Sequence, residues 1–401
     1  MPHSHHSHSG EYCSHAKDSL TDILTHAHSL GFTTYALSEH VPRALDSELY
    51  PEERQLKLNK DSLVDRFKSY LIHARKLQAQ YDSAPRSSQG SSMDVLVGCE
   101  TESTDGPEGD HLDFFINLLN NTLSPSVSQE ESKIPSRIGV GVVDYIVGSV
   151  HHVHSIPIDF DKETFNKALQ HYAPQSSTTE NQHLALMADY LDAQLHLLQR
   201  LRPEVIGHFD LCRLYAPQTA MKPSSAQSSK ELEQVWAKVE RNVRFAASYG
   251  ALFEINSASF RKGWETAYPG PEILELILSL GGRICLSDDS HGTAQVGLNY
   301  THTRSYLLSL QPSPPLLWYL RRRQPIPAYN QDEEDEEEVN RVARENSERP
   351  GAGAPTLFGR GTQAVPCWAQ EWSDWAGWEK IAARDAASST TTASASASSS
   401  S

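Results

Sequence analysis

The chain has 401 residues, of which 38% are hydrophobic, and a formal net charge of −16. This length is sufficient for one large domain or for two or three domains of ordinary size. The acidic balance argues against nucleic-acid binding as the main activity, because a phosphate backbone attracts basic rather than acidic surfaces.

The five cysteines are far apart in the sequence, and none belongs to a C-x-x-C pair. An odd number of isolated cysteines is typical of reduced thiols in the cytoplasm. The N-terminus lacks the apolar stretch of a signal peptide, and no apolar run approaches the ~18 residues of a membrane span. We therefore expect a cytoplasmic protein that does not act in a membrane.

Apolar runs and helical patterns alternate over about the first 300 residues. The runs predict buried strands at Thr33–Ser38, Met93–Gly98, Tyr145–Val150, Glu204–His208, Ala251–Asn256 and Arg283–Ser287. Amphipathic patterns predict helices at Asp18–Leu30, Lys60–Tyr81, Asn181–Leu201, Glu231–Tyr249 and Pro271–Leu280. Such alternation indicates an α/β fold with a parallel sheet.

Three stretches rich in Ser, Pro and Gln interrupt this pattern and predict surface insertions at Ala84–Ser92, Asn120–Arg137 and Ala216–Ser229. We expect residues 1–325 to form the folded unit. Residues 326–401 are expected to be a largely disordered extension, because they hold an acidic run and a Ser/Ala-rich tail. Within it, four tryptophans with helical spacing predict either a helix docked on the core or a partner-binding segment: Trp368, Trp372, Trp375 and Trp378.

Five of the predicted strands run into a residue that can bind a metal ion. The residues at these ends are Glu39-His40, Cys99-Glu100, His151-His152, His208 and Asp288-Asp289-Ser290-His291. A lone histidine is more often a surface or core residue than a ligand. The ends of parallel strands, however, gather on one face of a β/α barrel, which is where active sites form. This relation to the strand ends therefore favours a metal cluster.

The first fifteen residues, MPHSHHSHSGEYCSH, resemble an expression tag when judged alone. A His-x-His pair on an extended segment points both imidazoles to the same side, because side chains alternate along a strand. Two pairs have this spacing, His3/His5 and His6/His8, and only one is needed for a metal site.

The motifs H-x-H, SEH, GCE, GSVHH, GHFD and SDDSH occur in this order. Their order and number resemble the polymerase-and-histidinol-phosphatase (PHP) superfamily, in particular its fungal histidinol-phosphatase branch. The most specific stretches are HSHHSHSGEY, SVHHVHSIPIDFD, VIGHFDLCRLYAP, EINSASFRK and LSDDSHGTAQVG, which lie between Pro2 and about Tyr300.

The resemblance implies a distorted (β/α)7 TIM-like barrel with three divalent transition metal ions. The implied ligands are His6, His8, Glu100 and Asp289 for the first ion, Glu100, His151 and His208 for the second, and His15, His40 and His291 for the third. The S-G-E-Y sequence that follows favours His6/His8 over His3/His5. The SDDSH motif departs from the SDAH of many members, so Asp289 is taken as the ligand and Asp288 stays a possible substitute.

A mixed set of nitrogen and oxygen ligands suits Zn, Fe or Mn better than Mg or Ca. The resemblance implies hydrolysis of L-histidinol phosphate to L-histidinol and phosphate, a reaction of histidine biosynthesis. We expect a metal-bridging hydroxide to attack phosphorus without a phosphoenzyme, with Glu100, His208 and Asp289 as the catalytic residues. The sequence has neither a Walker-A loop nor a Cys followed six residues later by Arg.

Arg213, Arg261 and Lys262 follow predicted strands and are expected to bind the substrate phosphate, with surface bases as the alternative. The candidate partners for the substrate amine or imidazole are the carboxylates of Glu102, Asp105 and Asp159. The expected partner is a small phosphomonoester, with no nucleic acid and no membrane. Alternatives are an amidohydrolase, a PHP phosphoesterase for another substrate, or a metal-storage protein. The sequence leaves the oligomeric state open.

Overall fold

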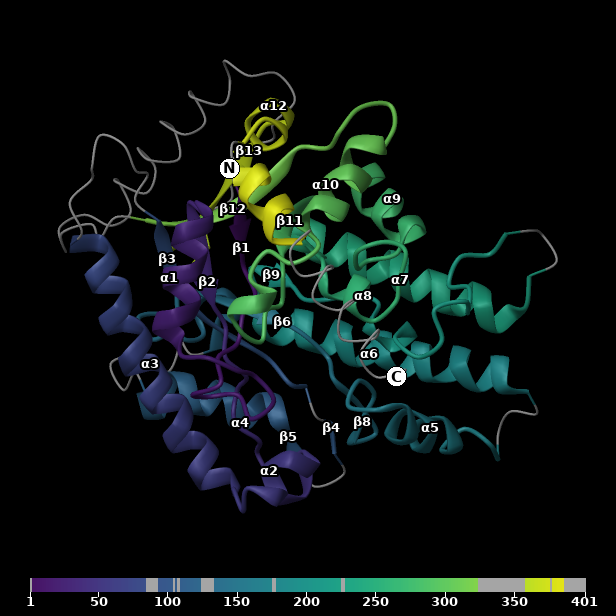
Figure 1. Cartoon of the computed structure of the whole chain (residues 1–401). Coiled ribbons are helices and arrows are strands. Elements are labelled where there is room, and N and C mark those ends of the chain that lie inside the picture. Colours follow the sequence, from purple (N-terminus) through teal and green to yellow (C-terminus); the bar gives the residue numbers. More distant parts are fainter. Residues whose placement is uncertain are drawn as a thin grey trace, which may run out of the picture.

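The computed structural model describes residues 2–83, 93–103, 105–106, 109–123, 133–174, 178–224, 228–323, 358–375 and 377–385. The predicted insertion at Ala84–Ser92 and the acidic run near residue 335 lie outside this part. The described part is an α/β fold with a largely parallel central sheet, as predicted (Figure 1).

Nine strands form the central sheet, and every neighbouring pair is parallel except the last, β12 with β13. In sheet order they are β1 (His3–Ser4), β2 (Thr34–Leu37), β3 (Asp94–Glu100), β6 (Tyr145–Gly148), β9 (Val205–Ile206), β10 (Leu252–Asn256), β11 (Arg283–Ser287), β12 (Leu317–Arg322) and β13 (Thr362–Cys367). All six strands predicted from apolar runs are confirmed. Two small sheets pair β4 (Asp105–Gly106) with β5 (Gly109–Asp110) and β7 (His152–Val153) with β8 (Ile156–Pro157).

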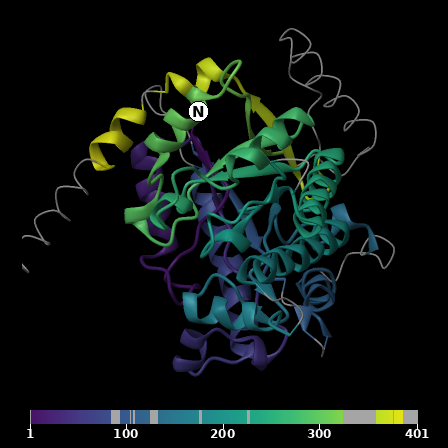
Figure 2. The same cartoon turned by 90° about the vertical axis from the view of Figure 1, so that its right-hand side faces the viewer.

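All five predicted helices are also confirmed. The α-helices are α1 (Leu20–Leu30), α2 (Pro51–Gln55), α3 (Lys60–Ser83), α4 (His111–Asn117), α5 (Lys162–Gln170), α6 (Thr179–Leu201), α7 (Lys230–Ser248), α8 (Ala258–Arg261), α9 (Pro271–Ser279), α10 (Tyr300–Ser309) and α12 (Ala369–Ser373). The Ser19 side chain caps the start of α1, and Gly31 ends it with a φ of 88°, a value that glycine adopts without strain. Helices α6 and α7 lie side by side along one flank of the sheet (Figure 2).

The strands bury side chains on both of their faces. Tyr35 and Leu37 of β2 belong to a large core shared with the helices, whereas Ala36 between them belongs to a second cluster. The same alternation occurs in β3, β6, β9, β10 and β11, which all contribute to the second cluster. Trp318 and Leu320 of β12 also belong to it. Six parallel strands therefore contribute side chains to one shared cluster, which contains no helix residue.

The end of β1 also approaches the chain that follows β11. Ser7 forms a parallel bridge with Ser290, and the His8 amide donates to the Ser290 carbonyl at 2.8 Å. The first and the seventh strands of the sheet order therefore meet at their carboxyl ends.

Part of the predicted C-terminal extension packs in the same core. Strand β13 pairs with β12, and Arg360, 3% exposed, donates to both carboxylate oxygens of Glu204 at 2.8 and 2.9 Å. Trp372 and Trp378 are buried, and the Trp372 indole donates to the Pro315 carbonyl at 3.2 Å. Of the two expectations for the Trp-rich segment, the structure therefore shows docking on the core.

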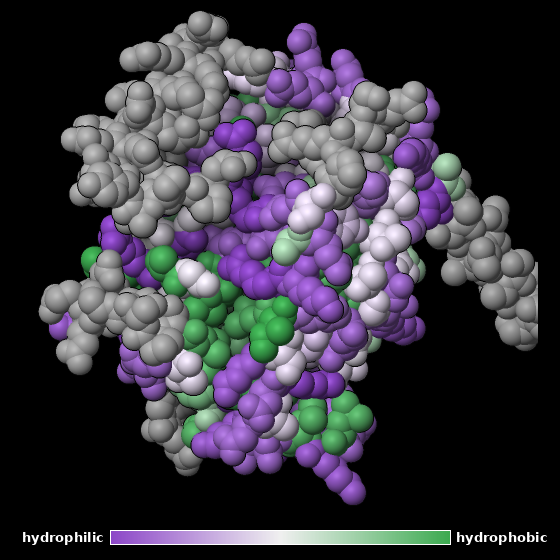
Figure 3. Space-filling view, turned by 90° about the vertical axis from the view of Figure 1, so that its left-hand side faces the viewer, coloured by the Kyte–Doolittle hydropathy of each residue, from purple (hydrophilic) through white to green (hydrophobic). Residues whose placement is uncertain are grey.

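The described residues include no helix with the length and apolar character needed to cross a membrane. Figure 3 shows a largely hydrophilic face, with apolar side chains gathered in a limited area.

Candidate metal centre

The structure brings the nine predicted ligands together where the parallel strands end. They lie after β1 or before α1 (His6, His8, His15), after β2 (His40), at the end of β3 (Glu100), after β6 and β9 (His151, His208) and after β11 (Asp289, His291). All nine belong to groups whose ligand atoms lie within 4.8 Å of one another. Histidines that are far apart in the sequence thus meet because the strands are parallel.

The first cluster surrounds one side of the Glu100 carboxylate. His6 Nε2 lies 3.0 Å from Oε1, and His8 Nε2 lies 3.3 Å from Oε2. Asp289 Oδ1 is 3.7 Å from His6 Nε2 and 3.6 Å from His8 Nε2. His6, His8 and Glu100 thus form one group of close ligand atoms, and Asp289 forms an adjoining group with His8 and His291.

The second cluster uses the same carboxylate. Glu100 Oε1 lies 3.3 Å from His151 Nε2 and 3.1 Å from His208 Nε2, and these two nitrogens are 3.3 Å apart. Glu100 is the residue common to both clusters, and its position suits a ligand that bridges two ions.

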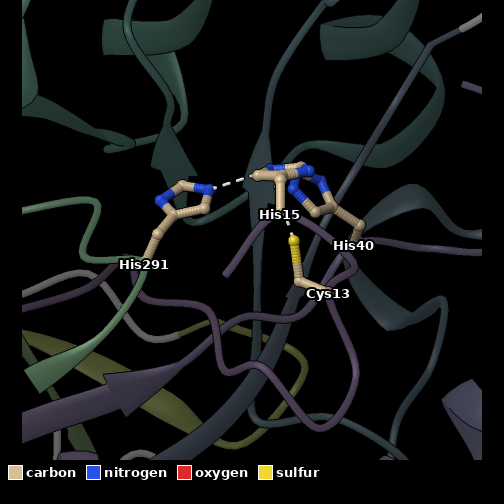
Figure 4. Close-up of side chains that lie close together, drawn as sticks. All are labelled: Cys13, His15, His40 and His291. Atoms are coloured by element: carbon tan, nitrogen blue, oxygen red, sulfur yellow. Dashed lines mark hydrogen bonds between the residues drawn. The ribbon is translucent and has the colours of Figure 1, made fainter. Parts of the chain in front are cut away.

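The third cluster lies next to His8, whose ring centroid is 4.2 Å from that of His40 and 4.6 Å from that of His291. His15 Nε2 and His291 Nε2 are 3.1 Å apart, and the ring of His40 lies beside His15 (Figure 4). Cys13, which the sequence did not suggest as a ligand, belongs to this group. The cluster is the most accessible of the three, because the side chain of His15 is 46% exposed.

The electrostatics of the centre favour added positive charge. Burial opposes protonation of His6, but the carboxylates of Glu100 and Asp289 outweigh it and raise the pKa of His6 well above its usual range. Burial likewise opposes ionisation of Glu100, but His6 and His151 lower the pKa of this carboxyl well below its usual value. The Nε2 atoms of His6 and His8 are buried without a hydrogen-bond partner. A divalent cation would satisfy both the orphaned nitrogens and the carboxylates.

Most of these imidazoles also contact an oxygen acceptor through Nδ1. Glu254 lies 3.1 Å from His6 Nδ1, and Glu52 lies 3.1 Å from His15 Nδ1. Glu102 contacts two imidazoles, His151 Nδ1 at 3.3 Å and His40 Nδ1 at 2.6 Å. The backbone carbonyl of Asp289 lies 3.0 Å from His291 Nδ1. Such partners fix the tautomer and the orientation of metal-binding histidines. The sequence reasoning missed Glu254 and Glu52 in this role. A carboxylate inside the apolar run ALFEIN was the available signal for Glu254, because a buried charge needs a partner.

The structure separates the two neighbouring aspartates. Asp289 faces the centre, whereas Asp288 accepts hydrogen bonds from Ser4 Oγ (2.9 Å) and from the Gly297 amide (2.6 Å). Burial raises the pKa of Asp288 to about 6. Asp289 has a positive φ of 48°, a strained conformation of the kind found at functional sites. The geometry therefore favours Asp289 over Asp288 as the ligand.

The three predicted phosphate-binding residues lie in different surroundings. The buried Arg213 guanidinium donates to Glu272 Oε1 (2.8 Å) and to the Pro217 carbonyl (3.0 Å). Arg261 donates to the carbonyls of Asp288 (3.0 Å) and Asp289 (2.8 Å), whereas Lys262 is exposed. Arg213 is thus committed to the fold, Arg261 braces the loop that carries Asp289, and Lys262 is accessible.

The candidate carboxylates for substrate recognition also differ. Glu102 is buried and contacts Arg43 Nη1 at 3.1 Å besides two imidazoles, so it is not available to a substrate. Asp159 keeps a buried Oδ1 without a hydrogen-bond partner, and burial raises the pKa of this residue although His151 and Lys262 lower it. The side chain of Asp105 lies outside the described part of the chain. Asp159 is therefore the carboxylate that is left for a ligand.

His3 and His5 stay outside the centre, as expected, but they have a structural role that the sequence did not show. His3 Nε2 accepts from the Leu286 amide at 2.8 Å, and His5 Nε2 accepts from the Leu320 amide at 2.9 Å. Burial lowers the pKa of His5 to about 4, so its imidazole is neutral and can accept. Both residues tie the first strand to the sheet.

The fold and this centre define an α/β protein whose histidines and carboxylates are suited to hold several divalent ions. The chain belongs to the PHP domain family, whose model matches residues 4–258. It is 42% identical over 307 residues to a provisionally assigned histidinol-phosphatase of Schizosaccharomyces pombe, covering 77% of this chain and 86% of that protein. It is 31% identical over 327 residues to the histidinol-phosphatase of Saccharomyces cerevisiae, covering 77% and 88%.

The fold is similar to that of a provisionally assigned histidinol phosphatase from Listeria monocytogenes, whose crystal structure has been solved. The TM-score is 0.53 at 21% identity, and the match covers 75% of this chain and 98% of the other. The likeness thus extends over nearly all of the other protein and shows a shared fold.

Proposed function

We propose that the chain catalyses the histidinol-phosphatase reaction, the hydrolysis of L-histidinol phosphate to L-histidinol and inorganic phosphate, in histidine biosynthesis. The observation that carries this proposal is the convergence of nine ligand residues on Glu100 and its neighbours, in a chain 42% identical to a relative assigned this activity. The substrate is therefore a small phosphomonoester.

Three divalent transition metal ions fit the donor set. His6, His8, Glu100 and Asp289 would hold the first ion, Glu100 with His151 and His208 the second, and His15, His40 and His291 the third. Imidazole and carboxylate ligands suit Zn, Fe or Mn. Such ions lower the pKa of a bound water and neutralise phosphate charge, which allows direct attack on phosphorus.

The protein's own residues position these groups and the substrate. Arg261 holds the backbone on which Asp289 turns toward the centre. We propose that the exposed Lys262 attracts the phosphate and that Asp159 pairs with a cationic group of the histidinol moiety; the absence of a hydrogen-bond partner at Asp159 Oδ1 supports the second role. Glu100, shared by two clusters, keeps their two groups of imidazoles at a fixed separation.

We further propose that the seven strands from β1 to β11 close as a distorted barrel. The parallel bridge between Ser7 and Ser290 and the cluster shared by six strands support closure. Closure would place every strand end on one rim, which is the arrangement that the three clusters need.

The test combines phosphate release with elemental analysis of the purified full chain. We expect strong preference for L-histidinol phosphate over other phosphomonoesters, and about three metal ions per chain. Glu100→Gln should lower kcat by roughly 10²–10³-fold, since metal stabilisation of the transition-state charge is worth several kcal/mol, and should lower metal content. The exposed Glu240→Gln serves as the control. Full activity of the Glu100 variant with unchanged metal content would refute the proposal.

A further inference from the structure

We propose that the thiolate of Cys13 is a fourth protein ligand of the third ion, together with His15, His40 and His291. This inference rests on the proposed function only for the presence of a divalent ion in that cluster. It assigns to the third ion one sulfur and three nitrogen ligands, unlike the nitrogen and oxygen ligands of the other two clusters.

The position of the thiol supports this assignment. Cys13 lies in the loop between β1 and α1, and its amide donates to the Ser9 carbonyl at 2.8 Å. The residue is 4% exposed, and its Sγ lies 3.3 Å from His15 Nε2. Figure 4 shows the sulfur directed at the ring of His15, next to His40. The thiol is thus turned inward to the cluster instead of toward solvent.

Two of the six distances between the four ligand atoms can be compared with the edges of a tetrahedral site. Bonds of about 2.3 Å to sulfur and about 2.0–2.1 Å to nitrogen give edges of about 3.6 Å between sulfur and nitrogen and about 3.4 Å between two nitrogens. The corresponding distances are 3.3 Å from Cys13 Sγ to His15 Nε2 and 3.1 Å from His15 Nε2 to His291 Nε2. The four ligand atoms all lie within 4.8 Å of one another.

A hydrogen bond from the thiol to His15 would explain one of these contacts but not the others. His15 Nδ1 faces Glu52 Oε1 at 3.1 Å, and His291 Nδ1 faces the Asp289 carbonyl at 3.0 Å. When each Nδ1 donates to its acceptor, both Nε2 atoms present lone pairs to each other. His40 Nε2 is buried without a hydrogen-bond partner. A cation between these nitrogens and the sulfur removes the repulsion and satisfies all of them.

Three properties follow. Binding releases the thiol proton to solvent as the sulfur–metal bond forms. A soft thiolate favours zinc over manganese at this cluster. Four protein ligands also close the coordination shell, which is typical of a structural site. The third ion would then fasten the loop of Cys13 and His15 to the segments after β2 and β11.

The test is cobalt substitution of the full chain, with Cys13→Ser compared with Cys367→Ala, which removes a buried thiol of β13. We expect a near-ultraviolet sulfur-to-cobalt charge-transfer band in the parent protein and in the Cys367 variant, and its loss in the Cys13 variant. X-ray absorption of the zinc-loaded parent should show one sulfur at about 2.3 Å. Cys13→Ser should weaken binding of one ion by at least about 10-fold, since even outer partners contribute that much.

Absence of sulfur coordination in the loaded parent protein, or a charge-transfer band that persists in Cys13→Ser, would overturn the inference. Phosphate release is measured in parallel. A protein that has the sulfur band but does not hydrolyse L-histidinol phosphate would refute the proposed function and leave Cys13 as a ligand.

Discussion

Glu254 offers the sharpest test of how the outer carboxylates act. Its side chain is buried, Oε2 lies 3.1 Å from His6 Nδ1, and Oε1 accepts from the His208 amide at 2.5 Å and from Asn256 Nδ2 at 2.7 Å. Glu254→Gln keeps the size of the side chain but replaces one acceptor oxygen by a donor. Either His6 or the His208 amide then loses its acceptor inside the protein, which costs about 1–3 kcal/mol.

The consequence is predicted for metal binding first and for catalysis second. Loss of such a partner weakens metal affinity by about 10–100-fold, equal to about 1.4–2.7 kcal/mol. Chelator competition should show this loss for Glu254→Gln, and kcat should fall while KM for the phosphomonoester changes little. Glu240→Gln, on the surface of α7, is the matched control. Parent-like metal affinity and kcat in the Glu254 variant would refute a positioning role.

Other predictions follow from single contacts. Trp372→Ala should lower the unfolding free energy by about 3–5 kcal/mol in urea titrations; an unchanged value would mean that the C-terminal segment is not docked. Arg213→Ala should lower the unfolding free energy by roughly 3–5 kcal/mol and leave KM unchanged; a large increase in KM would instead show that Arg213 binds the substrate phosphate. Arg261→Ala should reduce the metal content of the purified protein. Folding lowers the pKa of His5 from 6.5 to about 4. The neutral imidazole therefore stabilises the folded state above pH 6.5, and this contribution to the unfolding free energy, roughly 3 kcal/mol in total, is lost as the pH falls toward 4. His5→Gln, which accepts without titrating, should flatten that dependence in urea unfolding at pH 5 and 7; an equal slope would exclude His5 as its source.

The regular elements were predictable where a single physical signal dominates. A parallel strand buried on both faces reads as an apolar run, which is why β2, β3 and β11 were found. Strand β1 was not found as an apolar run because it consists of His3 and Ser4, and β13 contains the polar and proline-bearing sequence TQAVPC. The His-x-His spacing nevertheless predicted an extended first strand at the N-terminus, and β1 confirms it, whereas no prediction was made for β13, which depends on its pairing with the remote β12.

The candidate ligands were predictable because a strand end fixes where the next side chain points. His40, His151 and His208 each follow a strand directly, and parallel pairing brings them to one face. The roles of Arg213 and Glu102 were not predictable. A basic or acidic residue after a strand turns toward the substrate or toward the protein according to neighbours, here Glu272 and Arg43, that only the fold supplies.

The two N-terminal His-x-His pairs lie on one short segment, of which only His3 and Ser4 belong to β1, and the two pairs meet opposite requirements. His6 and His8 point to the centre, where Nε2 must be free of protein partners to bind a cation. His3 and His5 point to the other side, where Nε2 must be occupied by a backbone amide and the ring must stay neutral. A shift of one residue in this strand would exchange the two faces. Because β1 has only two paired residues, the amide contacts of His3 and His5 help to hold the register together with the bridge between Ser7 and Ser290, and this register decides which histidines face the centre.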